Sequence, residues 1–485
     1  MNKTGNITET RLSGNTLPSF LWEAIFSTIY VIITLPGSVF LTGYLLHLGA
    51  NNTQIGLLST IPMLANTIAP VASSFVDRAA SRKEIALKLA RPVRILWLVS
   101  AFIPLLVLFN GFPNPLILFV FIFIVVSLGM VSAAIAWTSW MGEIIPEKVR
   151  GFYFGRRTVV AGIVSMIMGP ILGRILDKTP DKHIGFSIIF GIGAAALLFS
   201  YYFLTRLPDA KNTVKIKENF SFGRIKEKVL KVFSDKNFMS LVKFNIAWTF
   251  TISFISVYVG VFMLKELKMS YTVISMFNII VSAVLLSITP FWGKMTDRYG
   301  NKPVMLICGY AIGLAPVIWF LMTPSNYFIA LPLVNVIGGI AWAGFGLAIF
   351  NLILKLAPRE ERPYFLSVNM LFTSVAAFLG PVCSGLLIDI IGTKRMDLGS
   401  YTGNFSFGVF QLIFILSVLM SFYPLSLLKK VTEPGDEDVG EVMQAVKTNI
   451  AGGFVEGMSV LFNYMMLPVA TSGRVVKKLI NKKQI

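Results

Sequence analysis

The sequence predicts an all-α polytopic membrane protein, with twelve transmembrane helices arranged in two pseudo-symmetric six-helix bundles. Three observations predict this fold. First, 55% of the 485 residues are hydrophobic and only 14% are charged, whereas soluble domains carry about 25% charged residues. Second, twelve apolar stretches are long enough to span a bilayer, because a spanning helix needs about 20 residues. Third, an Asp-Arg loop pattern occurs once in each half, which indicates a duplicated membrane unit.

The twelve stretches alternate with loops whose charges predict their orientation. The stretches lie near 20–47, 53–76, 92–110, 114–142, 152–177, 184–205, 239–265, 271–294, 303–323, 327–356, 364–391 and 405–428. Lys and Arg are retained on the cytoplasmic side of a membrane, and they gather in the second-to-third and fourth-to-fifth loops. We therefore expect a multi-pass protein of the cell membrane with both termini in the cytoplasm.

These stretches divide the chain into five segments. They are a cytoplasmic N-terminal segment at 1–17, an N-terminal six-helix bundle at 18–206, a basic cytoplasmic linker at 207–238, a C-terminal six-helix bundle at 239–430 and a cytoplasmic tail at 431–485. A further apolar run occupies 452–470 in the tail. If this run were a thirteenth span, the Lys and Arg residues after it would lie outside, against the charge rule. We favour an amphipathic helix that lies on the membrane surface.

The repeated loop pattern follows the second stretch and the eighth. Its residues are Asp77, Arg78 and Arg82 in the first copy and Gly293, Asp297, Arg298, Gly300 and Lys302 in the second. A carboxylate at a helix end can pair with nearby cations and with the positive N-terminus of a facing helix. The loops are therefore candidates for a latch, and the alternative is that their charges only set the topology.

The two loops resemble the major facilitator superfamily of secondary transporters, over about residues 18–430. In that family the loop after helix 2 carries Gly-x-x-x-Asp-Arg-x-Gly-Arg-Arg/Lys, and a second copy follows helix 8. The first copy here departs from the pattern, since Ser73 and Ala80 stand where glycines are usual. The resemblance implies that the loops hold the cytoplasmic side shut in the outward-facing form.

A second charged pattern follows the fourth stretch. The segment from Glu143 to Arg150 resembles the Glu-x6-Arg spacing of sugar porters, in which it joins the same cytoplasmic network of ion pairs. Arg362 is the counterpart of Arg150 in the second half, but Lys355 stands in the place of Glu143. The network is then not symmetric, and we expect Glu143 to be available for pairing with the other half.

Each half also contains a Gly-Pro pair inside a spanning stretch. Gly169-Pro170 resembles the core of the antiporter signature of helix 5, and Gly380-Pro381 lies in the eleventh stretch. Proline removes a helix hydrogen bond, and glycine permits close helix contact. A kink and close packing are equally consistent with these pairs.

The middle of the predicted membrane layer is nearly uncharged. Glu23 lies near one end of the first stretch, where it suits a helix cap or the latch better than a proton carrier, while Asp177 and Asp389 are related by the repeat and can line an outer vestibule. We expect a neutral, zwitterionic or amphipathic solute, since ionisable groups within membranes are normally functional. Candidate cavity residues are Asn66, Trp137, Ser253, Ser256, Asn278, Asn335, Trp342 and Thr373. Helix packing is the alternative role of each.

The composition argues against several classes of function. Two histidines and two cysteines suggest no metal site, no cofactor and no catalytic residue. Basic cytoplasmic loops explain the net charge of +19 without nucleic acid. We expect a monomeric secondary active or facilitative transporter, not an enzyme, that contacts membrane lipids, a small-molecule solute and a coupling proton or ion. Efflux is the first hypothesis, and uptake of a neutral metabolite such as a sugar or nucleoside is the alternative. A polytopic membrane enzyme and a transporter-derived sensor are the rivals.

Overall fold

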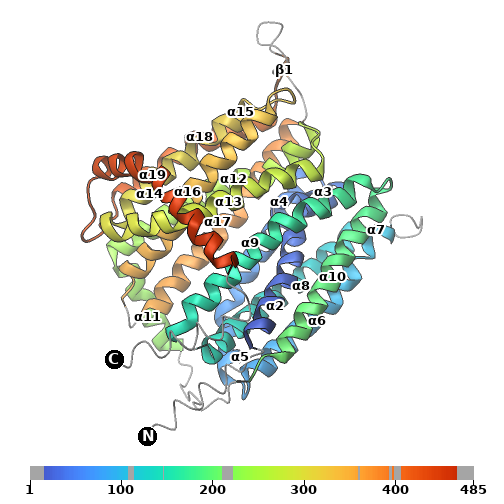
Figure 1. Cartoon of the computed structure of the whole chain (residues 1–485), viewed down its shortest axis with the longest axis horizontal. Helices are drawn as coiled ribbons and strands as arrows, with labels where there is room; N and C mark the ends of the chain where they lie inside the picture. Colours follow the sequence, from blue (N-terminus) through green and yellow to red (C-terminus); the bar gives the residue numbers. More distant parts are fainter. Residues whose placement is uncertain are drawn as a thin grey trace. The chain divides into compact units, whose positions relative to one another are not determined.

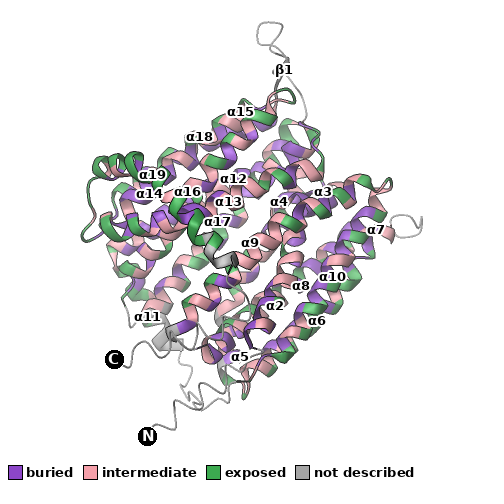
Figure 2. Cartoon of the chain, in the orientation of Figure 1, coloured by how far each residue is buried: buried purple, intermediate pink, exposed green. Residues whose placement is uncertain are grey.

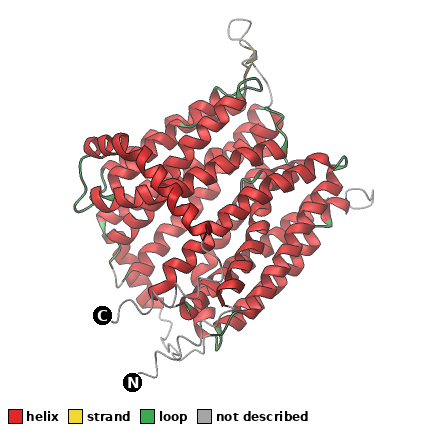
Figure 3. Ribbon diagram, viewed as in Figure 1, coloured by secondary structure: helices red, strands yellow, loops and turns green. Residues whose placement is uncertain are grey.

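A computed structural model describes most of the chain. The described residues are 16–106, 114–145, 147–209, 222–358, 361–392, 396–397 and 406–466. Almost all of them are helical (Figure 3), apart from two strands of two residues each, β1 (Met396–Asp397) and β2 (Ser406–Phe407), which pair antiparallel. The prediction of an all-α fold is confirmed.

The chain forms two compact units, which we describe separately. The first contains Met1–Leu35, Ile68–Glu218 and Leu461–Ile485, and the second contains Pro36–Thr67 and Asn219–Val460. The segment Pro36–Thr67 therefore packs with the second half of the chain, although it lies in the first half of the sequence.

The first unit contains seven of the described helices. They are α2 (Thr16–Thr34), α5 (Ala69–Arg78), α6 (Arg82–Ser100), α7 (Ile103–Leu106), α8 (Pro115–Ile144), α9 (Glu147–Lys178) and α10 (Lys182–Arg206). Helix α2 packs against α9 and α10, and α6 packs against α8. The buried Trp97 ring of α6 lies 5.4 Å from the ring of Phe190 and 5.2 Å from that of Tyr30, which ties α6 to α10 and α2.

The second unit contains the remaining described helices. They are α3 (Val39–His47), α4 (Asn52–Ala65), α11 (Phe222–Ser234), α12 (Lys236–Lys265), α13 (Tyr271–Tyr299), α14 (Asn301–Leu314), α15 (Pro316–Phe320), α16 (Tyr327–Leu356), α17 (Arg362–Ile391), α18 (Val409–Lys429) and α19 (Val439–Met466), the last of which runs past the unit's end at Val460 (Figure 1). Helix α12 packs against α17 and α18, and α16 packs against α13 and α14. Trp248 and Phe345 stack 4.6 Å apart within this core.

Eleven helical segments among the described residues are long and apolar enough to cross a membrane. The remaining predicted crossing, 53–76, is divided into α4, the short 3-10 helix η1 (Asn66–Ile68) and α5. No single piece of it is long enough to count as a span, which reconciles the eleven segments with the twelve predicted stretches.

One further predicted stretch is interrupted where the sequence carries helix breakers, and another has a different start. The stretch 20–47 is two helices, α2 and α3, because Pro36 and Gly37 lie between them and Gly37 adopts a φ of +79°. Glycine tolerates this left-handed conformation at little cost. The third stretch instead begins ten residues earlier than its predicted start, at Arg82, because Ser81 caps α6 by accepting a hydrogen bond from the Glu84 N–H.

Candidate functional site

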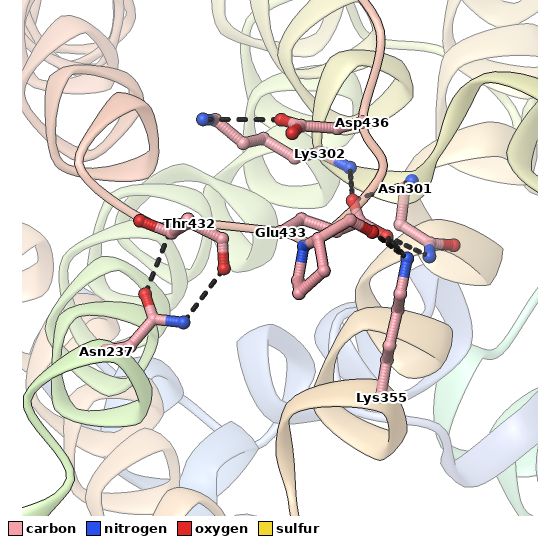
Figure 4. Close-up of polar contacts among 8 residues, drawn as sticks. Asn237, Asn301, Lys302, Lys355, Thr432, Glu433 and Asp436 are labelled. Atoms are coloured by element: carbon pink, nitrogen blue, oxygen red, sulfur yellow. Dashed lines mark hydrogen bonds and ion pairs between the residues drawn. The ribbon is translucent and has the colours of Figure 1, made fainter.

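The second Asp-Arg loop joins α13 to α14, and the buried carboxylate of Glu433 lies against it (Figure 4). One carboxylate oxygen accepts hydrogen bonds from the Asn301 N–H at 2.8 Å and the Lys302 N–H at 2.7 Å. The other oxygen accepts from Asn301 Nδ2 and from Lys355 Nζ, each at 2.8 Å. Glu433 therefore caps the N-terminus of α14 and also neutralises a cation of α16.

Neighbouring contacts hold the same part of the tail in place (Figure 4). Asn237 of α12 exchanges two hydrogen bonds with the backbone of Thr432, at 2.8 and 2.9 Å. Lys302 Nζ lies 3.5 Å from the Asp436 carboxylate, and the Glu437 N–H donates to the Tyr299 carbonyl. Gly300 has a φ of +94°, and the Cα of Asp436 lies 3.1 Å from the place of a Cβ on it. We call the contacts of residues 432–437 with α12, α14 and α16 the tail clasp.

The clasp has a defined pH dependence. Burial is the largest influence on the pKa of Glu433 and raises it, but the hydrogen bonds from Lys355, the Lys302 N–H and Asn301, with the charge of Lys355, outweigh burial and leave the pKa below its ordinary value. A depressed pKa means that the carboxylate stabilises the folded state above the unfolded pKa of about 4.3 and loses this contribution as the pH falls through the lower folded pKa. We expect the tail to stay bound at pH 7 and to detach only at a pH below the ordinary glutamate pKa of about 4.3.

Limited proteolysis within residues 432–437 measures this detachment. Cleavage is expected to rise as the pH falls below the ordinary glutamate pKa of about 4.3, when an acid-active protease is used at each pH. The Glu433→Gln variant is expected to be cleaved, across the whole pH range, at the rate that the unmodified protein reaches only at low pH. A rate in the unmodified protein that does not change with pH would contradict this role of Glu433.

The first Asp-Arg loop joins α5 to α6 in the other unit. Arg82 Nη1 pairs with Glu143 Oε1 of α8 at 2.8 Å. Ser81 Oγ donates to Asp209, at 2.8 Å, and Lys83 Nζ donates to the carbonyls of Thr205 and Leu207. Asp209 follows the sixth span as Glu433 follows the last one, so each loop has a carboxylate from the segment after its own half's final helix.

A matching hydrogen bond occurs in the two halves of the sequence and supports the repeat that the loops predict. Arg150 Nη2 donates to the Gly142 carbonyl at 2.8 Å, and Arg362 Nη2 donates to the Leu354 carbonyl at 3.1 Å. In both cases the carbonyl lies eight residues before the arginine. Arg150 and Arg362 therefore close the same turn at the end of a long helix in each unit.

The charges differ between the two copies of this network. Glu143 Oε1 pairs with Arg82 of its own half, and pairing of Glu143 with the other half stays a prediction. Lys355 replaces Glu143 in the second copy and therefore has no acidic counterpart at that position of the repeat. The tail supplies the missing carboxylate as Glu433, whose side chain is 0% exposed.

The Asp and Arg residues that define the loop pattern lie at its margin. Arg78, Asp297 and Arg298 are exposed, and the Arg298 guanidinium lies 5.1 Å from the ring of Tyr299. No hydrogen bond or ion pair of Asp297 is found among the described residues. The side chain of Asp77 lies outside the described residues. A latch formed by these side chains therefore stays a prediction.

A second polar cluster joins α4, α12 and α17 within the second unit. The Asp389 carboxylate accepts from the N–H and side chain of Asn52, at 3.3 and 2.8 Å, and from the N–H and hydroxyl of Thr53, at 2.8 and 2.6 Å. These are the first residues of α4, so Asp389 caps that helix from α17. The Tyr258 hydroxyl lies 3.0 Å from the Asn52 carbonyl and 2.7 Å from that of Pro381. We call this set of contacts the α4–α17 seam.

Glycines allow the backbones at this seam to approach closely. A Cβ on Gly56 would lie 2.5 Å from the Pro381 carbonyl oxygen and from the Tyr258 hydroxyl. A Cβ on Gly385 would overlap the Tyr258 hydroxyl and lie 2.9 Å from the Asn52 carbonyl oxygen. Any larger residue at either position would have to separate the helices.

The first unit contains a buried charged cluster around Glu23. Glu23 is 4% exposed and accepts from Arg157 Nη2 of α9 at 3.2 Å and from Ser200 Oγ of α10 at 3.4 Å. The Arg157 guanidinium lies 4.8 Å from the ring of Trp137. Arg157 Nε and Trp137 Nε1 are both buried and have no hydrogen-bond partner among the described residues.

Two sequence-based expectations about this cluster are wrong. Helix α2 begins at Thr16, so Glu23 lies two turns inside the helix and does not cap it. Glu23 also does not belong to the pairs that surround the Asp-Arg loops. Arg94 of α6 is buried nearby and donates to the carbonyls of Ala90 and Leu197, so the membrane interior of this unit holds more charge than we expected.

Four of the eight predicted cavity residues donate hydrogen bonds to helix carbonyls. The hydroxyls of Ser253, Ser256 and Thr373 donate to helix carbonyls, and Asn335 Nδ2 donates to the Phe277 carbonyl at 2.9 Å. These contacts are sufficient to explain the residues as packing. Asn66 and Trp137 are partly exposed, and Asn278 and Trp342 are exposed. A role in solute binding stays a prediction for all eight.

A pocket of about 500 Å³ opens between α12, α17 and α18. Its walls are almost entirely apolar and include Phe250, Phe372, Leu379 and Tyr423. None of the predicted cavity residues lines it. Hydrocarbon surfaces of this kind suit an acyl chain better than a polar solute.

The Gly-Pro pairs both lie within continuous helices. Pro170 is inside α9, and Pro381 is inside α17. A Cβ on Gly380 would overlap Ser253 Oγ and lie 2.8 Å from the Phe250 carbonyl oxygen. Gly380 therefore serves close packing of α17 on α12, while a kink at Gly169-Pro170 or Gly380-Pro381 stays a prediction.

Comparison with known proteins gives consistent matches. The Major Facilitator Superfamily profile matches residues 24–285 and 245–474. A putative proline/betaine transporter of Staphylococcus haemolyticus is 28% identical over 207 residues, which cover 40% of this chain and 42% of that protein. The multi-drug resistance efflux pump PmrA of Streptococcus pneumoniae serotype 4 is 27% identical over 156 residues, which cover 31% of this chain and 36% of the pump. The chain thus spans less than half the length of either relative.

A solved structure extends the comparison to nearly the whole fold. A mutant form of the nucleoside transporter NupG superposes with a TM-score of 0.68 at 14% identity, over 86% of this chain and 100% of NupG. At this identity the likeness concerns the fold.

Proposed function

Because the chain belongs to the Major Facilitator Superfamily, we propose that it is a secondary transporter that moves a small zwitterionic or amphipathic solute by alternating access. The observation that carries this proposal is the buried pair of Glu23 and Arg157 inside membrane-spanning helices. Ionisable residues at such depth are costly and normally functional. The proposed role is transport and not enzymatic catalysis.

The pair supports a zwitterionic cargo and a coupling proton. A solute with both charges can meet the Arg157 guanidinium with its carboxylate and Glu23 with its cation. Arg157 Nε and Trp137 Nε1 are buried and have no hydrogen-bond partner in the described part of the chain, so a solute carboxylate can accept from them. Proline and betaine, named in a relative of this chain, are zwitterions. Protonation of Glu23 would release Arg157, which couples solute binding to a proton.

The direction of transport has two candidates. Similarity to the PmrA efflux pump favours export, and similarity to the proline/betaine transporter favours uptake. The aromatic rings of Phe20 and Trp137 beside Arg157 are compatible with an amphipathic solute as well. We further propose a monomer in the cell membrane with cytoplasmic termini, because the basic loops lie at that end of the spans.

Proteoliposomes provide the direct test. Purified protein is reconstituted and assayed with radiolabelled proline and glycine betaine, and separately with an amphipathic fluorescent dye, with and without an imposed pH gradient. Accumulation that requires the gradient would establish coupled transport, and its direction would distinguish uptake from export. The absence of any protein-dependent movement of these compounds would count against the proposal.

Glu23→Gln is expected to abolish most of the gradient-driven accumulation, by at least about tenfold, because the amide cannot carry the proton. Exchange of solute without a gradient is expected to fall less than gradient-driven accumulation, because Arg157 can still bind the solute carboxylate. Glu84→Gln is the matched control, since Glu84 is an exposed glutamate of α6 that pairs with Lys88. Gradient-driven accumulation by Glu23→Gln at the level of this control would exclude Glu23 as the proton site.

A further inference from the structure

Helix α19, coloured red in Figure 1 and mostly exposed in Figure 2, contacts the spanning helix α13. A Cβ on Gly453 would overlap the Phe291 ring, and a Cβ on Gly457 would overlap the Ser287 carbonyl oxygen. The two glycines are four residues apart, and so are their partners. Helices in membranes associate through such small residues because the backbones can then approach closely.

Further contacts extend the same face of α19. The Ser287 hydroxyl lies 3.0 Å from the sulfur of Met458, and Lys294 Nζ bonds both carboxylate oxygens of Glu456 at 2.6 and 2.8 Å. This ion pair is exposed, so it contributes at most about 1 kcal/mol. The glycine contacts therefore dominate the seating of α19.

The depth of the contact follows from its place on α13. Ser287 lies twelve residues before Tyr299, at the end of α13, which corresponds to about 18 Å along the helix axis. The 29 residues of α13 correspond to about 44 Å, which exceeds the hydrocarbon core of about 30 Å by about 14 Å. With this excess shared between the two ends of α13, Ser287 and its neighbour Gly457 lie about 11 Å inside the core. The opposite side of α19 is apolar and exposed, with Val455 at 69% and Phe462 at 58%. A surface of this kind inside the bilayer depth meets lipid acyl chains.

We propose that α19 is an intramembrane strap, seated on α13 by Gly453 and Gly457, which enters one leaflet and restrains α13. The tail clasp fixes the start of this segment at α14, and the buried Val442 and Val446 join it to the core of the second unit. Helix α13 leads directly into the second Asp-Arg loop. The strap can therefore hold α13 in one position, and its effect on transport rests on the function proposed above.

The test compares leucine at two neighbouring glycines in a chain whose two cysteines are replaced by alanine. Gly457→Leu is expected to unseat the strap. Gly452→Leu is the matched control, because Gly452 is exposed and no atom lies within 4 Å of its Cβ position. A cysteine introduced at Val455 reports burial in lipid through its reaction with a membrane-impermeant maleimide in proteoliposomes.

In the chain without a leucine substitution and in the Gly452→Leu control, labelling of the cysteine at position 455 is expected to be slow. In Gly457→Leu it is expected to be at least about tenfold faster, since the thiolate reacts only when it is exposed to water. Fast labelling without the Gly457 change, or equal labelling in both leucine variants, would overturn the strap. This readout does not depend on transport, so a failure of the proposed function would leave it intact.

A transport assay tests separately whether the strap restrains α13. Where solute movement is measured, Gly457→Leu is expected to change the initial rate at least about threefold relative to Gly452→Leu, because α13 is released. Equal rates with unequal labelling would show that the strap is seated but does not restrain transport, and would overturn that part of the proposal.

Discussion

Replacing Gly385 by leucine is expected to separate α4 from α17 and to reduce transport at least about tenfold. The new side chain would occupy the position of the Tyr258 hydroxyl and press on the Asn52 carbonyl. Backbone groups cannot move aside as a flexible side chain can, and overpacking of this kind costs about 1–3 kcal/mol. About 1.4 kcal/mol is already a factor of ten in an equilibrium.

The reason for a functional effect lies in the sequence positions of the two helices. Helix α4 belongs to the first half of the sequence and α17 to the second, yet both lie in the second unit. If the halves move in the transport cycle, the α4–α17 seam must form in one state and open in another. A leucine at Gly385 would prevent the state in which Asp389 caps α4.

Initial rates of solute movement in proteoliposomes measure this effect. Gly346→Leu is the control, because it adds the same side chain to another helix of the same unit at a position with no atom within 4 Å. Gel filtration and thermal unfolding would show whether both variants are folded. A Gly385→Leu protein that is folded and transports at the rate of the control would mean that the seam is not part of the cycle.

Removing the charge of Asp389 is expected to weaken the α4–α17 seam less than a leucine at Gly385 does. The four hydrogen bonds that Asp389 accepts are charge-assisted, but the residue is exposed and water weakens them. Their combined contribution is about 2 kcal/mol.

The sequence relates Asp389 to Asp177 by the repeat and places both near an outer vestibule, but it contains no signal for pairing with Asn52, which is more than 300 residues away.

Much of the fold follows from patterns that a single sequence carries. The lengths of the apolar stretches predicted the spans, and the repeated loops predicted a duplicated construction that the matching hydrogen bonds of Arg150 and Arg362 support. Breaks at Pro36 and at Asn66 were missed, because hydropathy averages over a window in which two short helices look like one long helix. The start of α6 was placed too late since Lys88, Arg91 and Arg94 suggested a loop, although Arg94 is buried in the helix.

The candidate sites were predictable only in part. The Asp-Arg pattern located both loops, but the carboxylates that bind them, Asp209 and Glu433, come from segments that no loop motif includes. The replacement of Glu143 by Lys355 was the available signal for Glu433, since a cation at that place of the repeat needs an acid from elsewhere. Glu23 was visible in the sequence, but its depth depends on where α2 begins.

Glu433→Gln is expected to destabilise the second unit by about 3 kcal/mol and to lower its thermal midpoint by about 5 °C or more. The amide would keep the shape of the side chain, but it could not neutralise Lys355. Its NH₂ group would also replace an oxygen that now accepts hydrogen bonds, so a donor would be placed against other donors. Lys355 is 42% exposed, so water compensates part of its charge when the carboxylate is removed. The larger cost arises at the buried end, where the N–H groups of Asn301 and Lys302 lose a charged acceptor. The double variant Glu433→Gln with Lys355→Met is therefore expected to recover part of the loss.

Asp436→Asn is the matched control, since its carboxylate is partly exposed and lies 3.5 Å from Lys302, and it should cost less than about 1 kcal/mol. Thermal unfolding in detergent, followed by tryptophan fluorescence, measures all of these variants. If Glu433→Gln unfolds at the temperature of Asp436→Asn, or if the double variant is less stable than Glu433→Gln alone, Glu433 does not neutralise Lys355 in the way its geometry indicates.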